Sequence, residues 1–250
     1  MYFRKIICTI FTIAVVVMLA SCGGTFRGNV TEGEGPLIYR TFQTDDFFAI
    51  DLAGFFAVSF TQSDEFAVTI VMQENLLDQH EVVVRNGSLT ITDNIRGGVS
   101  FGYTPRLYLY APYLTHITLG GGVIAMDWDE IRTDVLDIST SGFASLNIPL
   151  NVDVLTINAS GSSILQLQGR ATAVTAVISG FVEVQALELQ AANVTINGSG
   201  SAEMEIAVSD ALDVDLSGFS LVRHSGNPIV TSRFGERGRL EQVQGSGYED

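Results

Sequence analysis

The sequence predicts an all-β protein, a single-chain β-solenoid with coils of about 19 residues. Three observations predict it. Glycines recur at nearly constant spacing through residues 115–224, apolar and polar residues alternate before each glycine, and a second alternating segment follows most of them. Alternation with a period of two residues is typical of strands with one buried face. A repeat this short cannot bury its apolar side alone, so successive repeats must stack as coils.

The repeat is clearest when the glycines are aligned. Six glycines follow one another at spacings of 21, 19, 19, 20 and 18 residues. At the positions two, four and six residues before them, fifteen of eighteen residues are apolar, whereas eleven of twelve residues at positions three and five are polar. A propeller blade would need about 40 residues, so a solenoid coil fits better. The six glycines are Gly121, Gly142, Gly161, Gly180, Gly200 and Gly218.

A second strand is expected after the corner, because apolar residues stand four and six positions beyond each of the four middle glycines. Serine precedes the glycine in five of the six copies, so the unit is a strand, a Ser-Gly corner, a strand and a variable turn. Glycine tolerates positive φ and close backbone approach, and a serine hydroxyl can bond local backbone groups. The interior is predicted to include Ile157, Leu165, Leu167, Ile178 and Ile196.

Alternating segments also precede the repeats. Residues 49–52 and 56–60 are expected to form a hairpin with a glycine near its turn, and Asn86-Gly87 indicates a second turn between strands. One short helix is expected, around Glu74 to Gln79.

Residues 1–21 are predicted to be a lipoprotein signal peptide. Two basic residues precede an apolar run at 6–19, which is shorter than the roughly 20 residues that a spanning helix needs. The following Leu-Ala-Ser-Cys resembles a lipobox, in which cleavage exposes a cysteine that carries lipid. An ordinary signal peptide that happens to contain a cysteine is the alternative. Cys8 would leave with the signal, so Cys22 would be the single cysteine of the mature chain and its acylation site.

The remaining boundaries follow from composition. Residues 22–37 are Gly-rich and polar and are expected to form a flexible tether. Residues 38–235 are expected to be the solenoid domain, and residues 236–250 a polar C-terminal tail. We therefore expect an exported protein, anchored by lipid to a bacterial membrane in the cell envelope. The outer membrane and the cell surface are both candidate locations.

The charge of the predicted mature chain limits its partners. From Cys22 onward it has 11 arginines, no lysine and 28 acidic residues, so its formal charge is 11 − 28 = −17. Nucleic acid is not expected as a partner, since phosphate binding needs clustered Lys and Arg. Electrostatic docking on anionic lipid is disfavoured for the same reason. The charge indicates an acidic, solvated surface.

These segments together resemble the GIN-domain family, the putative auto-transporter adhesin head domains of bacterial lipoproteins. The resemblance covers roughly residues 42–234. It implies a right-handed β-helix with an adhesive or cell-envelope role and no defined ligand. The segments that carry it are residues 47–52, 82–91, 107–112 and 225–228 and the ordered series of Ser-Gly steps.

No catalytic residues, metal site or cofactor are predicted. The chain has three histidines, His80, His116 and His224, and the latter two are expected at the surface without a catalytic partner. A serine that precedes glycine is not a nucleophile elbow, because no helix follows it. The acidic residues Asp127, Asp129 and Glu130 could bind a cation such as Ca²⁺. An acidic turn is the preferred interpretation, because the spacing of a calcium loop is missing.

Two classes of function remain. The first is a noncatalytic module for adhesion, binding or scaffolding, with a glycan or an envelope protein as its partner and its oligomeric state left open. The second is a polysaccharide-processing enzyme, a lyase or a glycosidase. A glycosidase needs two carboxylates about 5–10 Å apart, and the best pair is Glu183 and Glu203, at matching positions of successive coils. A lyase is poorly provided for, because Arg170 is the single basic residue between Asp134 and Val222.

Phenylalanine follows the corner glycine in alternate coils, at Phe143, Phe181 and Phe219. Coils stack about 4.8 Å apart, so the three rings are expected about 9.6 Å apart in a row. The preferred interpretation is that they fill gaps in the core. The alternative is an exposed aromatic stripe that binds sugar or a partner protein.

Overall fold

The computed structural model describes residues 30–244. The predicted signal peptide, Cys22 and the first part of the predicted tether lie outside this range. Residues Val30–Glu32 (β1) and Gly98–Ser100 (β8) form a two-stranded sheet of their own. No helix within 30–244 is long and apolar enough to cross a membrane.

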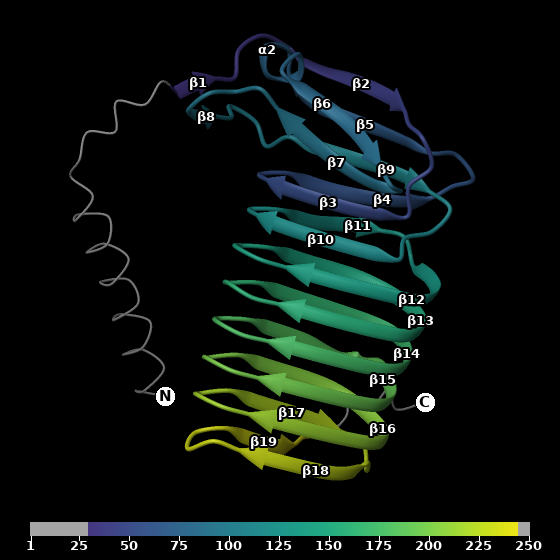
Figure 1. Ribbon diagram of the computed structural model, residues 1–250, viewed down its shortest axis with the longest axis vertical. Helices are drawn as coiled ribbons and strands as arrows, with labels where there is room; N and C mark the ends of the chain where they lie inside the picture. Colours follow the sequence, from purple (N-terminus) through teal and green to yellow (C-terminus); the bar gives the residue numbers. More distant parts are fainter. Residues whose placement is uncertain (1–29, 245–250) are drawn as a thin grey trace, which may run out of the picture. The chain divides into compact units, whose positions relative to one another are not determined.

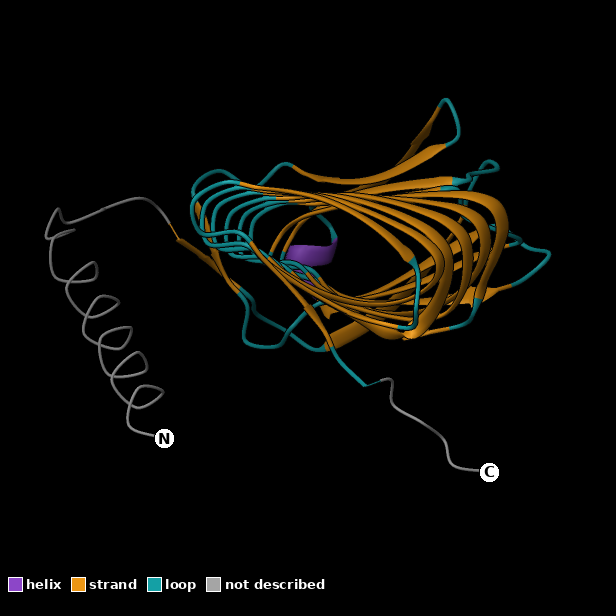
Figure 2. Cartoon of the chain, turned by 90° about the horizontal axis from the view of Figure 1, so that it is seen from below, coloured by secondary structure: helices purple, strands orange, loops and turns teal. Residues whose placement is uncertain are grey.

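The large unit is a β-solenoid of about seven coils, as predicted. Figure 1 shows the coils as a regular stack, and Figure 2 shows that the chain turns sharply at one side of every coil. Each central strand begins just after one glycine corner and ends just before the next. One long, bent strand therefore supplies both faces of the stack. These strands are β13 (Ser145–Ala159), β14 (Ile164–Ile178), β15 (Glu183–Gly198) and β16 (Glu203–Leu216).

Successive coils pair in parallel and in the predicted register. Ile157 pairs with Ala176, which pairs with Ile196 in the next coil. Equivalent inward side chains thus lie over one another and form apolar columns through the stack. All five residues predicted for the interior are at most 2% exposed. Burial of this apolar surface, worth roughly 25 cal/mol per Å², is the main force that holds the coils together.

The expected hairpin at residues 49–60 is wrong. Its two segments are β3 (Ala49–Gly54) and β4 (Ala57–Gln62). The first pairs in parallel with β10 (His116–Gly121), and the second with β11 (Ile124–Trp128). They are successive sides of the first coil, and their partners come from the next coil, which β12 (Ile131–Thr140) follows. A short glycine turn looks alike in a hairpin and at a coil corner, so local sequence could not separate the two.

The N-terminal end of the stack is closed by antiparallel strands and a helix. Strand β5 (Ala67–Gln73) pairs antiparallel with both β2 (Leu37–Gln43) and β9 (Arg106–Ala111). The predicted helix is present but short, at Glu74–Leu77 (α2), and it buries Leu76 and Leu77. The predicted turn at Asn86-Gly87 joins the antiparallel strands β6 (His80–Arg85) and β7 (Ser88–Asp93).

Within residues 30–244, no helix or antiparallel strand closes the C-terminal end of the stack, which is therefore called the open end. Strand β17 (Leu221–Ser225) continues one face, and β18 (Ile229–Phe234) continues the other with all six residues exposed. Strand β19 (Arg239–Gln242) lies within the segment predicted as a polar tail, where its Leu240 pairs with Val222 of the preceding coil. Ordered chain likewise begins before the predicted end of the tether, because the Asn75 amide donates to the Glu32 carbonyl.

Candidate functional site

The glycine corners form a continuous backbone ladder. The residue after each corner glycine donates its N–H to the carbonyl of the corner glycine one coil earlier, over 2.6 to 2.8 Å. Gly161 shows why glycine is needed, because its φ is +80° and a Cβ there would lie 2.6 Å from the carbonyl oxygen of Gly142. The corners are therefore close-packed backbone, and each must present its next side chain outward.

The phenylalanines that follow these glycines are exposed. Phe143 is 73% exposed, Phe181 67% and Phe219 62%. The preferred interpretation, that they fill gaps in the core, is wrong. The alternating pattern in the sequence already indicated that these rings are exposed. Interior residues stand an even number of positions from the glycine, whereas these rings stand one position after it. The residue two positions after the glycine is the one that turns inward, as Val182 does at 1% exposure.

A fourth phenylalanine belongs to the same row and was missed from sequence. Phe55 follows the corner at Gly54, which pairs in register with Gly121 of the next coil, and it is 63% exposed. It escaped notice because its coil lies before the repeat frame, separated from the next corner by the strands that close the N-terminal end. The sequence could have indicated Phe55, because it follows a glycine at the end of an alternating strand, as the other phenylalanines of the row do. We call Phe55, Phe143, Phe181 and Phe219 the corner phenylalanine row.

Small residues separate the phenylalanines of the row. Gly122 stands one coil after Phe55, and a Cβ there would lie 2.4 Å from the Phe55 ring. That ring therefore lies against the next corner and leaves no room for a side chain. Ser162 and Ser201 hold the corresponding places in later coils. Since neighbouring coils are about 4.8 Å apart, the alternation sets a ring spacing of about 9.6 Å.

The last ring of the row already has a cationic partner. The Arg237 guanidinium carbon lies 4.5 Å from the centroid of the Phe219 ring, within the range of a cation–π contact. Arg237 lies between β18 and β19, at the corner that follows Phe219. This internal contact shows that a ring of the row can bind a guanidinium group.

The corner serines bond backbone of the preceding coil. The Ser160 hydroxyl donates to the Thr140 carbonyl over 3.1 Å, and Ser217 donates to Gly198 over 3.3 Å. Local turn bonds come instead from serines on the inner side, since Ser163 donates to the carbonyl of Ser160 over 3.0 Å. These hydroxyls hold coils together and are not arranged as nucleophiles.

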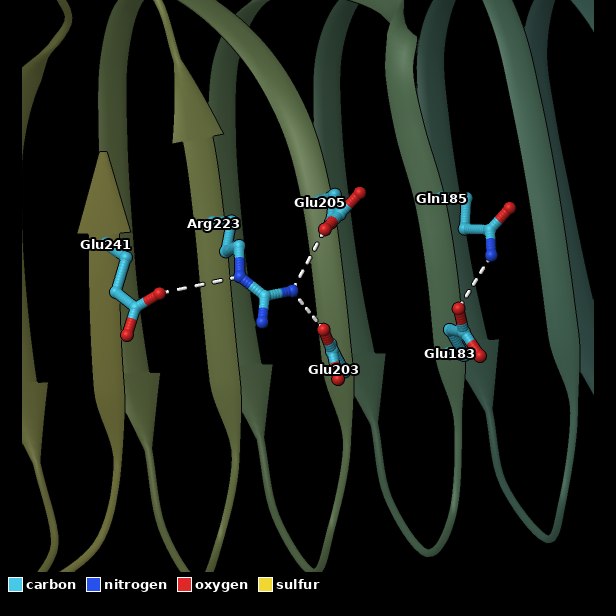
Figure 3. Close-up of polar contacts among 6 residues, drawn as sticks. All are labelled: Glu183, Gln185, Glu203, Glu205, Arg223 and Glu241. Carbon is cyan, nitrogen blue, oxygen red and sulfur yellow. Dashed lines mark hydrogen bonds and ion pairs between the residues drawn. The ribbon is translucent and has the colours of Figure 1, made fainter. Parts of the chain in front are cut away.

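The two carboxylates proposed for a glycosidase do lie in register, one coil apart. Figure 3 shows that each is engaged by a different neighbour. Glu183 accepts a 2.6 Å hydrogen bond from Gln185, and Glu203 forms an ion pair with Arg223. Each carboxylate is therefore held by a neighbour of its own, the Gln185 amide or the Arg223 guanidinium.

Arg223 is the centre of this charged cluster. Besides Glu203, its guanidinium contacts Glu205 at 2.9 Å and Glu241 at 3.4 Å (Figure 3). The hydrogen bond that Arg223 donates to the Glu203 carboxylate raises the pKa of Arg223 above its ordinary value. From β17, one arginine therefore links carboxylates of the two strands that pair with it, β16 and β19, which suits a structural clasp between coils.

Two of the histidines are buried. His224 was expected at the surface but is 5% exposed, because it occupies an inward position in register with Ile206. His80 is 7% exposed, and its Nδ1 lies 2.8 Å from the Leu76 carbonyl. His116 is exposed as expected, and its Nε2 lies 3.1 Å from the Asp137 carboxylate of the next coil.

The acidic turn around Trp128 makes structural contacts. Asp129 accepts the backbone N–H of Gln62 over 2.9 Å, and Glu130 forms an ion pair with Arg132. Trp128 is buried and donates its indole N–H to the Val58 carbonyl over 2.8 Å. Within residues 30–244, no group of three or more His, Cys, Asp or Glu side chains is placed to hold a metal ion.

These features define the protein as a β-solenoid that exposes a phenylalanine at the glycine corner of alternate coils. The model of the family described as "Putative auto-transporter adhesin, head GIN domain" matches residues 46–228, and the chain belongs to that family. This confirms the resemblance noted from the sequence.

Solved structures share the fold. A crystal structure of a putative adhesin from Bacteroides fragilis is 20% identical, with a TM-score of 0.79, and the match covers 85% of this chain and 99% of that one. A putative adhesin from Parabacteroides distasonis is 19% identical, with a TM-score of 0.72 and coverage of 86% and 100%. A putative lipid binding protein from the same species is 17% identical, with a TM-score of 0.71 and the same coverage. No curated protein matches the chain.

Proposed function

We propose that this protein is a noncatalytic adhesion module of the bacterial cell envelope, and that the corner phenylalanine row is its contact surface. The observation that carries the proposal is the exposure of four rings, each more than 60% open to solvent, at the same corner of alternate coils. Large apolar side chains that are exposed together along one side of a protein often mark an interaction site. A regular ladder also repeats one weak contact several times, which favours binding by multivalency.

The membrane anchor belongs to the same proposal. A lipid on Cys22 would hold the solenoid at the membrane, with the residues up to Val30 as a spacer. Support comes from the sequence, in which the cysteine follows an apolar run and small residues. Fractionation of cells that express the wild type or Cys22→Ala tests the anchor. We expect the wild type in the membrane fraction and the variant released, and equal partition of both would contradict the anchor.

The contact surface is tested by replacing Phe143, Phe181 and Phe219 with serine in the full chain. Binding of the variant and of the wild type is compared on a glycan array and on a panel of immobilised envelope and matrix proteins. We expect the wild type to bind at least one surface and the variant to lose that binding.

A matched control removes exposed apolar side chains that lie outside the row, at Val154, Ile164 and Val177, which are 41 to 45% exposed. This control should bind as the wild type does. Equal binding by both triple variants and the wild type would show that the row is not the contact surface. Turnover of a polysaccharide that is lost on Glu183→Gln would instead support the enzymatic alternative.

A further inference from the structure

We infer that the corner phenylalanine row accepts an extended peptide segment in the polyproline II conformation, with an arginine at every third residue. The inference rests on the proposed function, because it names the ligand class of the same surface. It draws on three properties of the row: the contact that its last ring already makes, the charge around the other rings, and the spacing between rings.

The internal contact shows the chemistry of recognition. Arg237 stacks over Phe219 at 4.5 Å, while the other three rings of the row stay open to solvent. A guanidinium group stacks on an aromatic face at a smaller desolvation cost than an ammonium group, so arginine suits such contacts better than lysine. Each open ring can therefore receive from a partner the contact that Arg237 supplies within the chain.

The segments of the chain that carry the open rings are acidic. Within six residues on either side of Phe55, Phe143 and Phe181, the chain has no Lys, Arg or His. The same windows contain Asp51, Asp137 and Glu183, of which Asp137 lies 3.1 Å from the His116 ring of the neighbouring coil. The whole chain has a formal charge of −15. A cationic segment is therefore drawn to this face by the long-range field as well as by the rings.

The spacing of the row selects the backbone conformation of the ligand. Rings on alternate coils are about 9.6 Å apart. A polyproline II helix has three residues per turn and rises about 3.1 Å per residue, so every third side chain points the same way at intervals of about 9.3 Å. A β-strand repeats its side-chain direction after about 6.7 Å, and an α-helix after about 5.4 Å. Residues seven apart on an α-helix also share a side, at intervals of about 10.5 Å. That interval is about 0.9 Å longer than the spacing of the row, whereas the polyproline II interval is about 0.3 Å shorter and therefore matches the row best.

The test uses the full chain in mild detergent and a fluorescent twelve-residue peptide, (Pro-Pro-Arg)4, as the probe in an anisotropy titration. The first comparison peptide has the same composition in scrambled order, which removes the three-residue spacing and keeps the charge. The second replaces arginine with glutamate. We expect the regular peptide to bind about tenfold more tightly than the scrambled one, and the acidic peptide not to bind.

Variants of the protein locate the contact. Phe143→Ser with Phe181→Ser should weaken binding of the regular peptide about tenfold. Val154→Ser with Val177→Ser, the matched control, should leave it unchanged. Arg237→Ala frees the Phe219 ring and should strengthen binding about twofold to threefold.

Equal affinity for the regular and scrambled peptides would overturn the inference, because charge alone would then explain binding. Failure of the regular peptide to bind would overturn it as well. If the triple phenylalanine variant still loses binding to the glycan or protein panel, the adhesion proposal stands without this ligand. If that variant binds the panel as the wild type does, the adhesion proposal falls separately.

Discussion

The interior columns and the corner phenylalanine row repeat with the coils, and both consist of large apolar residues, yet they differ in burial. Leu165 and Val184 follow one another in a column and are fully buried. Phe143 and Phe181 follow one another in the row and are at least 67% exposed. The buried columns stabilise the fold, whereas the exposed rings of the row contribute little to its stability. In a solenoid, apolar character alone does not identify the core, and the position relative to the corner glycine does.

The largest effect is expected inside a column. Leu167→Asp would bury an unpaired charge between coils and should lower the free energy of unfolding by about 3 kcal/mol or more. Thr175→Asp, at an exposed position between two threonines of neighbouring coils, is the control and should cost under about 0.5 kcal/mol. Chemical denaturation measures both. Similar losses for the two would mean that the inward and outward positions are assigned in reverse.

A smaller effect is expected at the corner backbone. Gly161→Ala forces a side chain into a positive φ and against the carbonyl of Gly142, so it should cost about 1–3 kcal/mol. Ser162→Ala, one residue further on, keeps the backbone and should be nearly neutral. Thermal unfolding measures both variants. If Gly161→Ala is as stable as the wild type, the corner backbone can accommodate a Cβ atom and the glycine is not required there.

The alternation of phenylalanine and small residues at successive corners can be tested by placing two phenylalanines at neighbouring corners. Gly122→Phe places a ring where the Phe55 ring now lies, and the flexible Phe55 side chain must move aside. The expected cost is about 1 kcal/mol, typical of crowding at a partly open site. Phe55→Ser in the same chain should restore stability, because it removes the competing ring. Absence of this rescue would mean that the two corners do not share one space.

The smallest effect is expected when three rings of the row are removed. Phe143→Ser, Phe181→Ser and Phe219→Ser together should change the melting temperature by about 2 °C or less, because the rings are already mostly in water. Unfolding of this triple variant would contradict the distinction between the columns and the row.

Much of the fold could be predicted because glycine spacing and alternation are local properties of the chain. They identified the coils, the register and the five interior residues. The pairing of β3 and β4 could not be predicted in the same way, since their partner residues lie 67 positions further along the chain (116 − 49 and 124 − 57). The burial of His224 was missed because a polar residue occupies an inward position close to the open end.

The candidate site was only half visible in the sequence. Three phenylalanines were identified by their spacing, but their exposure depends on how the corner directs the following side chain. Phe55 lay outside the repeat frame, and the contact between Arg237 and Phe219 joins the last corner to a segment predicted as a tail. Both require the folded coils to bring distant residues together.

The alternation of ring and small residue has a consequence for how such a chain can change in length. Duplication or deletion of one coil would set two phenylalanines, or two small residues, at neighbouring corners. A change of two coils, 38 residues as between Phe143 and Phe181, leaves the pattern in phase. Homologues that keep the row should therefore differ in length by even numbers of coils, a parity rule that the apolar columns do not impose.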